Sequence, residues 1–164
     1  MLGALRKELE TEGFNLHGVQ HFSNNLLAKQ GRLGKIDPLE EDWVSIEQGL
    51  RISQSIGELD IGQSIIVQDG VIIGVEAIEG TDALIERCEP LLNKKRRAFL
   101  IKTCKPQQDT DLDLPTIGLK TVINAHKFGL SGIVVHAGNS LILDSKKVAQ
   151  EADRLNIFIY GYNI

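Results

Sequence analysis

Around residue 63 the apolar pattern of the chain changes from helical spacing to alternation. Before this point, the apolar residues from Trp43 to Leu50 recur at helical spacing, and Asp37 and Pro38 ahead of them suit an N-cap and a first helical turn. We therefore expect a helix that begins at this pair and ends near Gly57, with Trp43 as a core anchor.

After the change, two β-rich runs follow each other closely. Ser64 to Gln68 and Val71 to Val75 are separated by Asp69 and Gly70 alone. Because Asp-Gly between two such runs is a strong signal for a tight turn, this segment predicts a β-hairpin.

The rest of the chain alternates between helical and strand patterns. Strands are expected at 98–103, 132–136, 141–143 and 157–160, with a short one at 14–19. Helices are expected at 2–12, from 81 or 82 to 88, at 119–128 and from 144 or 145 to 155, with helix and loop between 20 and 34. Strands that alternate with helices, together with one hairpin, predict an α/β layered domain in which helices pack on a mixed sheet.

Composition is that of an ordinary globular domain, because the 164 residues are 42% hydrophobic and 24% charged. The longest apolar run falls short of the roughly 18 residues that a membrane span needs, and the start of the chain lacks the order of a secretory signal, so we expect a cytoplasmic protein. Cys88 and Cys104 match no metal or redox spacing and are interpreted as reduced structural thiols. The four histidines show no ligand spacing and are interpreted as surface or structural residues.

The charge balance argues against a nucleic-acid partner, since the formal net charge is −4. The only basic cluster runs from Lys94 to Arg97. We interpret it as a solvated turn ahead of a buried strand, with a helper role in holding an anionic ligand or lipid surface as the alternative.

The segment from Lys102 to Pro115 carries the densest chemistry. Its carboxylates Asp109, Asp111 and Asp113 are spaced two apart, so in an extended segment they project to one side, where they can converge on a divalent cation. A calcium loop is excluded because the required Gly and Glu are missing, whereas Mg²⁺ needs only one or two carboxylates and phosphate oxygens. The alternative is a solvated acidic turn.

A second acidic loop, Val75 to Asp82, is the natural partner of the first. Glu76 and Glu79 are either exposed at a turn, or they face the aspartates as metal ligands or as a general base. Thr81 and Asp82 are interpreted as helix caps, at a helix N-terminus that can also bind phosphate.

Several motifs in these loops together resemble one family. They are Gly62 to Gly70, Val75 to Asp82, Leu100 to Lys102, Lys105-Pro106, Gln108-Asp109, Asp113 to Pro115 and Gly118, along with the Glu-Glu-Asp-Trp run at residue 40. The chain is similar to the C-terminal domain of LpxI-type UDP-2,3-diacylglucosamine pyrophosphatases, from the helix at residue 2 to Tyr160.

The resemblance implies a magnesium-dependent cytoplasmic hydrolase of lipid A biosynthesis. Such an enzyme splits UDP-2,3-diacylglucosamine into 2,3-diacylglucosamine 1-phosphate (lipid X) and UMP. It further implies a homodimer that holds the lipid between two domains, and peripheral contact with the inner face of the inner membrane through the lipid substrate.

The resemblance also implies roles for individual residues. Asp113, Asp109 and Glu79 are the candidate catalytic residues. Lys102, Lys105, Gln108, Gln63 and Thr81 are expected to bind the substrate. Asp109, Asp113, Glu76 and Asp82 are expected to hold Mg²⁺.

The chain departs from the family pattern in two ways. Asp111 stands where the family carries a basic residue, which leaves its role open. The N-terminal family domain is also absent, so residues 1–164 are expected to form a single C-terminal catalytic-type domain, with residues 1–60 as a helical lead-in between domains. An excised domain, a split gene or a remnant would each give weak or no turnover alone. Alternatives to an enzyme are a binding module for nucleotide or lipid phosphate and a structural dimerisation domain.

Overall fold

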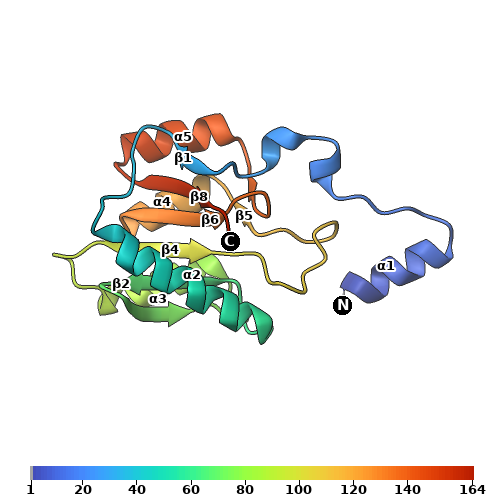
Figure 1. Cartoon of the computed structure of the whole chain (residues 1–164), viewed down its shortest axis with the longest axis horizontal. Helices are drawn as coiled ribbons and strands as arrows, with labels where there is room; N and C mark the ends of the chain where they lie inside the picture. Colours follow the sequence, from blue (N-terminus) through green and yellow to red (C-terminus); the bar gives the residue numbers. More distant parts are fainter. Residues whose placement is uncertain (1) are drawn as a thin grey trace.

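The computed structural model describes residues 2–164 and contains a six-stranded sheet with helices on both faces (Figure 1). The helices are α1 (Leu2–Thr11), α2 (Asp42–Glu58), α3 (Thr81–Cys88), α4 (Leu119–Lys127) and α5 (Ser145–Arg154), with 3₁₀ turns η1 (Val19–His21), η2 (Asn24–Leu26) and η3 (Glu89–Leu91). The strands are β1 (Gly31–Leu33), β2 (Ser64–Gln68), β3 (Val71–Val75), β4 (Ala98–Lys102), β5 (Thr116–Ile117), β6 (Gly132–His136), β7 (Leu141–Ile142) and β8 (Phe158–Tyr162).

The large sheet is mixed, with strand order β1-β8-β6-β4-β2-β3. Its centre is parallel, because β6 pairs in parallel with both β4 and β8. Its edges are antiparallel, since β2 pairs in that sense with β3 and β4, and β1 pairs in that sense with β8. The predicted α/β domain with a mixed sheet, one hairpin and packed helices is confirmed.

Both faces of the sheet are buried. Helix α2 packs on one face through Ile46 and Leu50, against Phe99 of β4 and Phe158 of β8. Helices α3, α4 and α5 cover the other face and pack on residues such as Leu100. Because successive side chains of β4 point into different cores, this strand has the continuous apolar sequence of a fully buried strand.

The Asp-Gly hairpin is confirmed. Asp69 and Gly70 both have positive φ, 50° and 73°, as a tight I′-type turn between twisted strands requires. The register of β2 with β3 shifts between Ile66 and Val67, which marks a bulge.

The predicted start of the long helix at Asp37 is wrong, because α2 begins at Asp42. Asp37 instead pairs with Arg32. The buried Asp42 carboxylate accepts the backbone N–H of Leu39 at 2.8 Å. The segment ahead of α2 is therefore held by a side chain inside the helix.

Arg97 also binds this carboxylate, with contacts from its Nε and Nη2 to Asp42 of 2.8 to 3.1 Å. Its guanidinium also lies over the rings of Phe99 and Phe158. The basic cluster is otherwise an exposed turn, so the interpretation as a turn ahead of a buried strand describes three of its four residues, Lys94, Lys95 and Arg96. The fourth fastens α2 to the sheet.

Two predictions for the N-terminal region differ in outcome. The helix at 2–12 corresponds to α1, which is followed by Gly13 with a φ of 89°. The strand at 14–19 is wrong, because this segment pairs with no other strand and ends in η1. The pattern also missed β1 and β5, which are three and two residues long and too short to show alternation.

The two cysteines and Trp43 are at least partly buried. Both cysteines are free and buried, and burial raises the pKa of each thiol. Trp43 is half-buried and packs edge-on against Tyr160. Within residues 2–164, no helix combines the length and the apolar character needed to cross a membrane.

Candidate functional site

The two acidic loops begin at the same end of the sheet. Strand β2 lies between β3 and β4, and its first residue, Ser64, pairs with Lys102 at the end of β4. The Ser64 carbonyl also accepts the backbone N–H of Glu76, which follows the last residue of β3, at 2.8 Å. The antiparallel hairpin therefore brings Glu76 beside Lys102, although 26 positions separate them in the chain.

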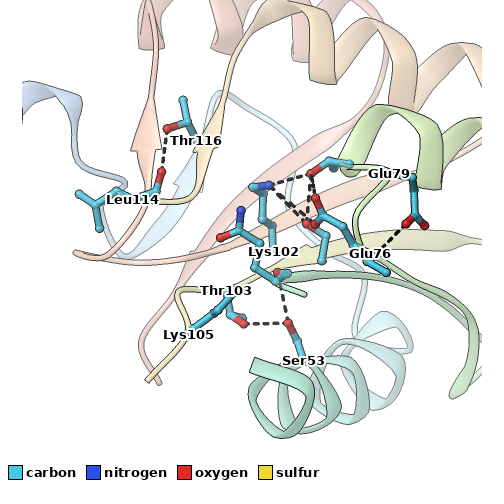
Figure 2. A network of polar contacts seen from close by, with 12 residues as sticks. Ser53, Glu76, Glu79, Lys102, Thr103, Lys105, Leu114 and Thr116 are labelled. Carbon is cyan, nitrogen blue, oxygen red and sulfur yellow. Dashed lines mark hydrogen bonds and ion pairs between the residues drawn. The ribbon is translucent and has the colours of Figure 1, made fainter. Parts of the chain in front are cut away.

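Lys102 is the centre of a buried polar network (Figure 2). Its ammonium donates to Thr81 Oγ1 at 2.7 Å and to Ser64 Oγ at 3.4 Å. The same ammonium lies 4.0 Å from Glu76 Oε2, and the Thr81 hydroxyl donates to Glu76 Oε1 at 3.0 Å. Lys102 and Glu76 are only 4% and 6% exposed, so this charge pair is held away from solvent.

The electrostatics of Lys102 connect both loops. Burial lowers the pKa of Lys102, while the nearby carboxylates of Glu76, Asp113 and Asp82 oppose that shift. Within the described residues, Glu76 Oε2 is buried and has no hydrogen-bond partner.

Thr81 and Asp82 do not cap α3 as predicted. The N-cap is Gly80, with a φ of 82° and no side-chain hydrogen bond. The Thr81 hydroxyl is used by Lys102 and Glu76, and Asp82 pairs with Lys120 at 2.7 Å and accepts from Asn124 at 3.0 Å. Lys120 keeps the pKa of Asp82 below its usual range.

The loop after β4 borders a cavity of about 530 Å³. The lining residues are Gly3, Asp60, Lys105, Gln107, Gln108, Asp109, Leu112 and Asp113. Lys105 pairs with Asp60 at 2.7 Å, and Gln108 Nε2 donates to Asp113 at 2.8 Å. The cavity therefore combines an ammonium and an amide with carboxylates, as a site for a phosphorylated ligand and a cation does.

The predicted carboxylates differ in how far they are already paired. Arg6 of α1 binds Asp109 at 2.5 Å. Asp113 is exposed and takes part in no ion pair within residues 2–164, so its carboxylate is the one free to bind an added cation.

Glu79 faces a different way. It accepts from Arg87 at 2.9 and 3.0 Å and from the backbone N–H of Ala77 at 3.0 Å. Its own backbone N–H and Arg87 lower the pKa of Glu79. In Figure 2 its carboxylate lies apart from Lys102 and Glu76, so the structure does not bring Glu79 into their network.

Gln63 precedes β2 and is bonded to the start of the loop after β4. Its carbonyl accepts the backbone N–H of Thr103 at 2.9 Å, and its buried side-chain Oε1 has no hydrogen-bond partner within the described chain. Ser53 of α2 reaches the Thr103 hydroxyl at 2.7 Å (Figure 2). This contact anchors the start of the loop to the helix.

The fit of a metal ion follows from these contacts. No group of three or more His, Cys, Asp or Glu side chains within residues 2–164 is arranged to hold one. Mg²⁺, however, retains most of its waters and needs only one or two protein carboxylates besides phosphate oxygens. Asp113 meets that smaller demand, because it is exposed and takes part in no ion pair within residues 2–164, whereas Glu76 Oε2 is buried 4.0 Å from the Lys102 ammonium.

Sequence reasoning missed three residues that complete this region. Ser64 supports Lys102, Asp60 pairs with Lys105, and Arg6 binds Asp109. Ser64 lies beside Gln63 within one of the motifs that resemble the family, so the sequence could have pointed to it. No sequence motif points to Asp60 or Arg6, because each reaches its partner through tertiary contact alone.

Comparison with known proteins identifies similar sequences. The family described as "LpxI C-terminal domain" matches residues 29–160. A curated relative from Caulobacter vibrioides, "UDP-2,3-diacylglucosamine pyrophosphatase LpxI", is 39% identical over 167 residues. The alignment covers 98% of this chain and 60% of the relative, so the chain spans about 60% of the relative's length.

Proposed function

This chain belongs to the LpxI family, and we propose that it takes part in hydrolysing the pyrophosphate bond of UDP-2,3-diacylglucosamine, giving 2,3-diacylglucosamine 1-phosphate and UMP. The name of the Caulobacter relative supports this reaction. The observation that carries the proposal is the cavity after β4, lined by Lys105 and Asp113, at the sheet end where Lys102 pairs with Glu76 of the second loop.

Lys105 and Gln108 are proposed to bind the pyrophosphate. Both line the cavity, and the Lys105 ammonium can exchange its exposed partner Asp60 for phosphate oxygens. An exposed ion pair contributes little to stability, so this exchange costs little. Gln108 stands between Lys105 and Asp113, because its Oε1 accepts the Lys105 backbone N–H while its Nε2 donates to Asp113.

Asp113 is the proposed catalytic carboxylate, and Glu76 is a second proposed metal ligand once its oxygen turns away from Lys102. These residues would hold Mg²⁺, which supplies charge stabilisation for the pyrophosphate oxygens when bound. Asp113 can also accept a hydrogen bond from water and orient it toward the phosphorus. Lys102 adds positive charge at the same end of the sheet, and Thr81 and Ser64 hold its ammonium in place.

Asp109, Asp82 and Glu79 receive smaller roles in this proposal. Each is paired with a cation of its own chain, so each needs that partner to move before it can bind metal. The homodimer, the cytoplasmic address and the contact with the inner membrane face stay predictions.

The test is the release of UMP from UDP-2,3-diacylglucosamine and Mg²⁺, followed by mass spectrometry. Because the chain spans about 60% of the relative, the assay is run with and without the remaining part of the Caulobacter protein. We expect UMP in at least one mixture and a loss of about 100-fold or more with Asp113→Asn.

The matched control is Asp37→Asn, an exposed aspartate that pairs with Arg32 away from the cavity, which should leave the rate unchanged. Tight binding of the nucleotide without UMP would instead indicate a binding module. An equal rate for Asp113→Asn and the unchanged chain would remove Asp113 from the mechanism.

A further inference from the structure

An N-terminal arm, residues 2–22, lies against the loop that carries the proposed catalytic carboxylate. It consists of α1, an extended linker and η1. Figure 1 shows α1 outside the layers formed by the sheet and the other helices. None of residues 3–22 belongs to either hydrophobic core, so the position of the arm needs another explanation.

The contacts of the arm converge on three successive loop residues. Gln20 Nε2 donates to the Thr110 carbonyl at 2.8 Å, and Arg6 binds Asp109. Asp111 receives the most: His21 Nε2 lies 2.7 Å from its Oδ1, and the Gly18 backbone N–H donates to the same oxygen at 3.3 Å. Arg6 lies 3.8 Å from its other oxygen.

Most of the apolar side chains of the arm that the structure describes are largely exposed. Phe14 and Phe22 are 62% and 78% exposed, and Leu5 and Val19 are about half exposed. The polar contacts to residues 109–111 are therefore the attachment, and Asp111 is its centre.

Asp111 also belongs to a tight turn that ends at the proposed catalytic residue. The backbone N–H groups of Leu112 and Asp113 donate to the Asp109 carbonyl at 3.1 and 3.0 Å. The Asp111 N–H donates to the Asp109 carboxylate at 3.1 Å. A turn bonded in this way moves as one unit, so fixing Asp111 also fixes Asp113.

We propose that Asp111 is a positioning residue, which fastens the N-terminal arm to the turn 109–113 and so sets the position of Asp113 in the cavity. This inference rests on the proposed function for the importance of Asp113, but the mechanical coupling does not. It gives a role to a carboxylate that the sequence left without one. Arg6 reaches the cavity wall through the same attachment.

Hydrogen–deuterium exchange on the full chain tests the coupling without substrate. With Asp111→Ala, we expect about tenfold faster exchange both at Gly18 to Phe22 and at the amides of Leu112 and Asp113, because a charge-assisted attachment is lost. Thr110→Ala is the matched control, since Gln20 binds the backbone carbonyl at that position and the contact survives. Faster exchange in the arm with unchanged exchange in the turn would overturn the proposal.

A double variant checks that Asp111 acts through the arm. His21→Gln and Asp111→Ala remove the same contact, so their combination should loosen the turn no more than Asp111→Ala alone. Additive effects would show that Asp111 acts elsewhere and would overturn the proposal.

The UMP assay provides the catalytic readout. A displaced Asp113 should lower kcat about tenfold with KM within about twofold, whereas an unchanged kcat would contradict a positioning role. If the unchanged protein releases no UMP in any mixture, the proposed function fails. The exchange result then still decides whether the arm positions the turn.

Discussion

Lys102 is a charged residue of the site whose side chain is almost fully buried. It ends a strand whose residues are all buried, so its stem extends the apolar core while its ammonium reaches Thr81 and Glu76. Burying a charge is costly unless it is paired and hydrogen-bonded, and here the two loops supply both kinds of partner. The pair thus ties the stability of this sheet end to the proposed chemistry.

Replacing Lys102 by Met should destabilise the protein. Glu76 would remain buried without a cation, which costs about 3 kcal/mol in the free energy of unfolding. The double variant Lys102→Met with Glu76→Gln removes both charges and should recover most of that loss. Urea unfolding measures both values, and a double variant as unstable as the single one would show that the pair does not act as a pair.

At the scale of elements, the hairpin and the segment before it are fitted closely together. Gly62 lies against the carbonyl of Glu76, and a Cβ at position 62 would overlap that backbone atom. Backbone cannot move aside as a flexible side chain does, so the start of β2 and the end of β3 depend on glycine at this position. The placement of Glu76 beside Lys102 depends on the same contact.

We therefore expect Gly62→Ala to cost about 2 kcal/mol in unfolding free energy and to reduce UMP release. Gly118→Ala is the control, because a Cβ there meets its nearest neighbour, Leu143 Cβ, at 3.9 Å. Its cost should stay below about 1 kcal/mol. Thermal unfolding compares the two variants, and equal costs would contradict the close fit at Gly62.

At the scale of the whole molecule, strand order decides where the chemistry gathers. The central sheet places β4 between β2 and β6, so the loops after β3 and β4 open at one end. The loop after β4 then reaches α1 through Asp109 and borders the cavity. A ligand in this cavity would contact the loop after β4 together with Asp60 and Gly3 and should stabilise the fold as a whole.

UDP with Mg²⁺ at about 100 times the dissociation constant should add about 2.7 kcal/mol to stability, which for a domain of this size raises Tm by about 5 to 10 °C. Asp113→Asn should abolish the part of the shift that depends on Mg²⁺. Differential scanning fluorimetry measures the shift in Tm with UDP alone, with Mg²⁺ alone and with both together. A full Mg²⁺-dependent shift in the variant would place the metal elsewhere.

Local signals in the sequence determined several elements and the family. The Asp-Gly turn, the buried strand at 98–102 and the glycine after the helix at 119–127 were predictable, because neighbouring residues alone set these conformations. The resemblance to the LpxI family is confirmed by the family match over residues 29–160. The sequence also singled out the two loops, while the functional roles of Lys102, Lys105 and Asp113 stay predictions.

Only the tertiary structure decided which strands and which charged side chains pair with one another. The strand β1 pairs along the edge of β8, and Asp42, the first residue of α2, is bound by Arg97, which lies 55 positions away in the chain. In the same way Arg6, 103 positions away, occupies Asp109, while Asp113 stays free of ion pairs within residues 2–164. Spacing shows where carboxylates occur along the chain, but the availability of each one depends on cations brought close by folding, which no local pattern encodes.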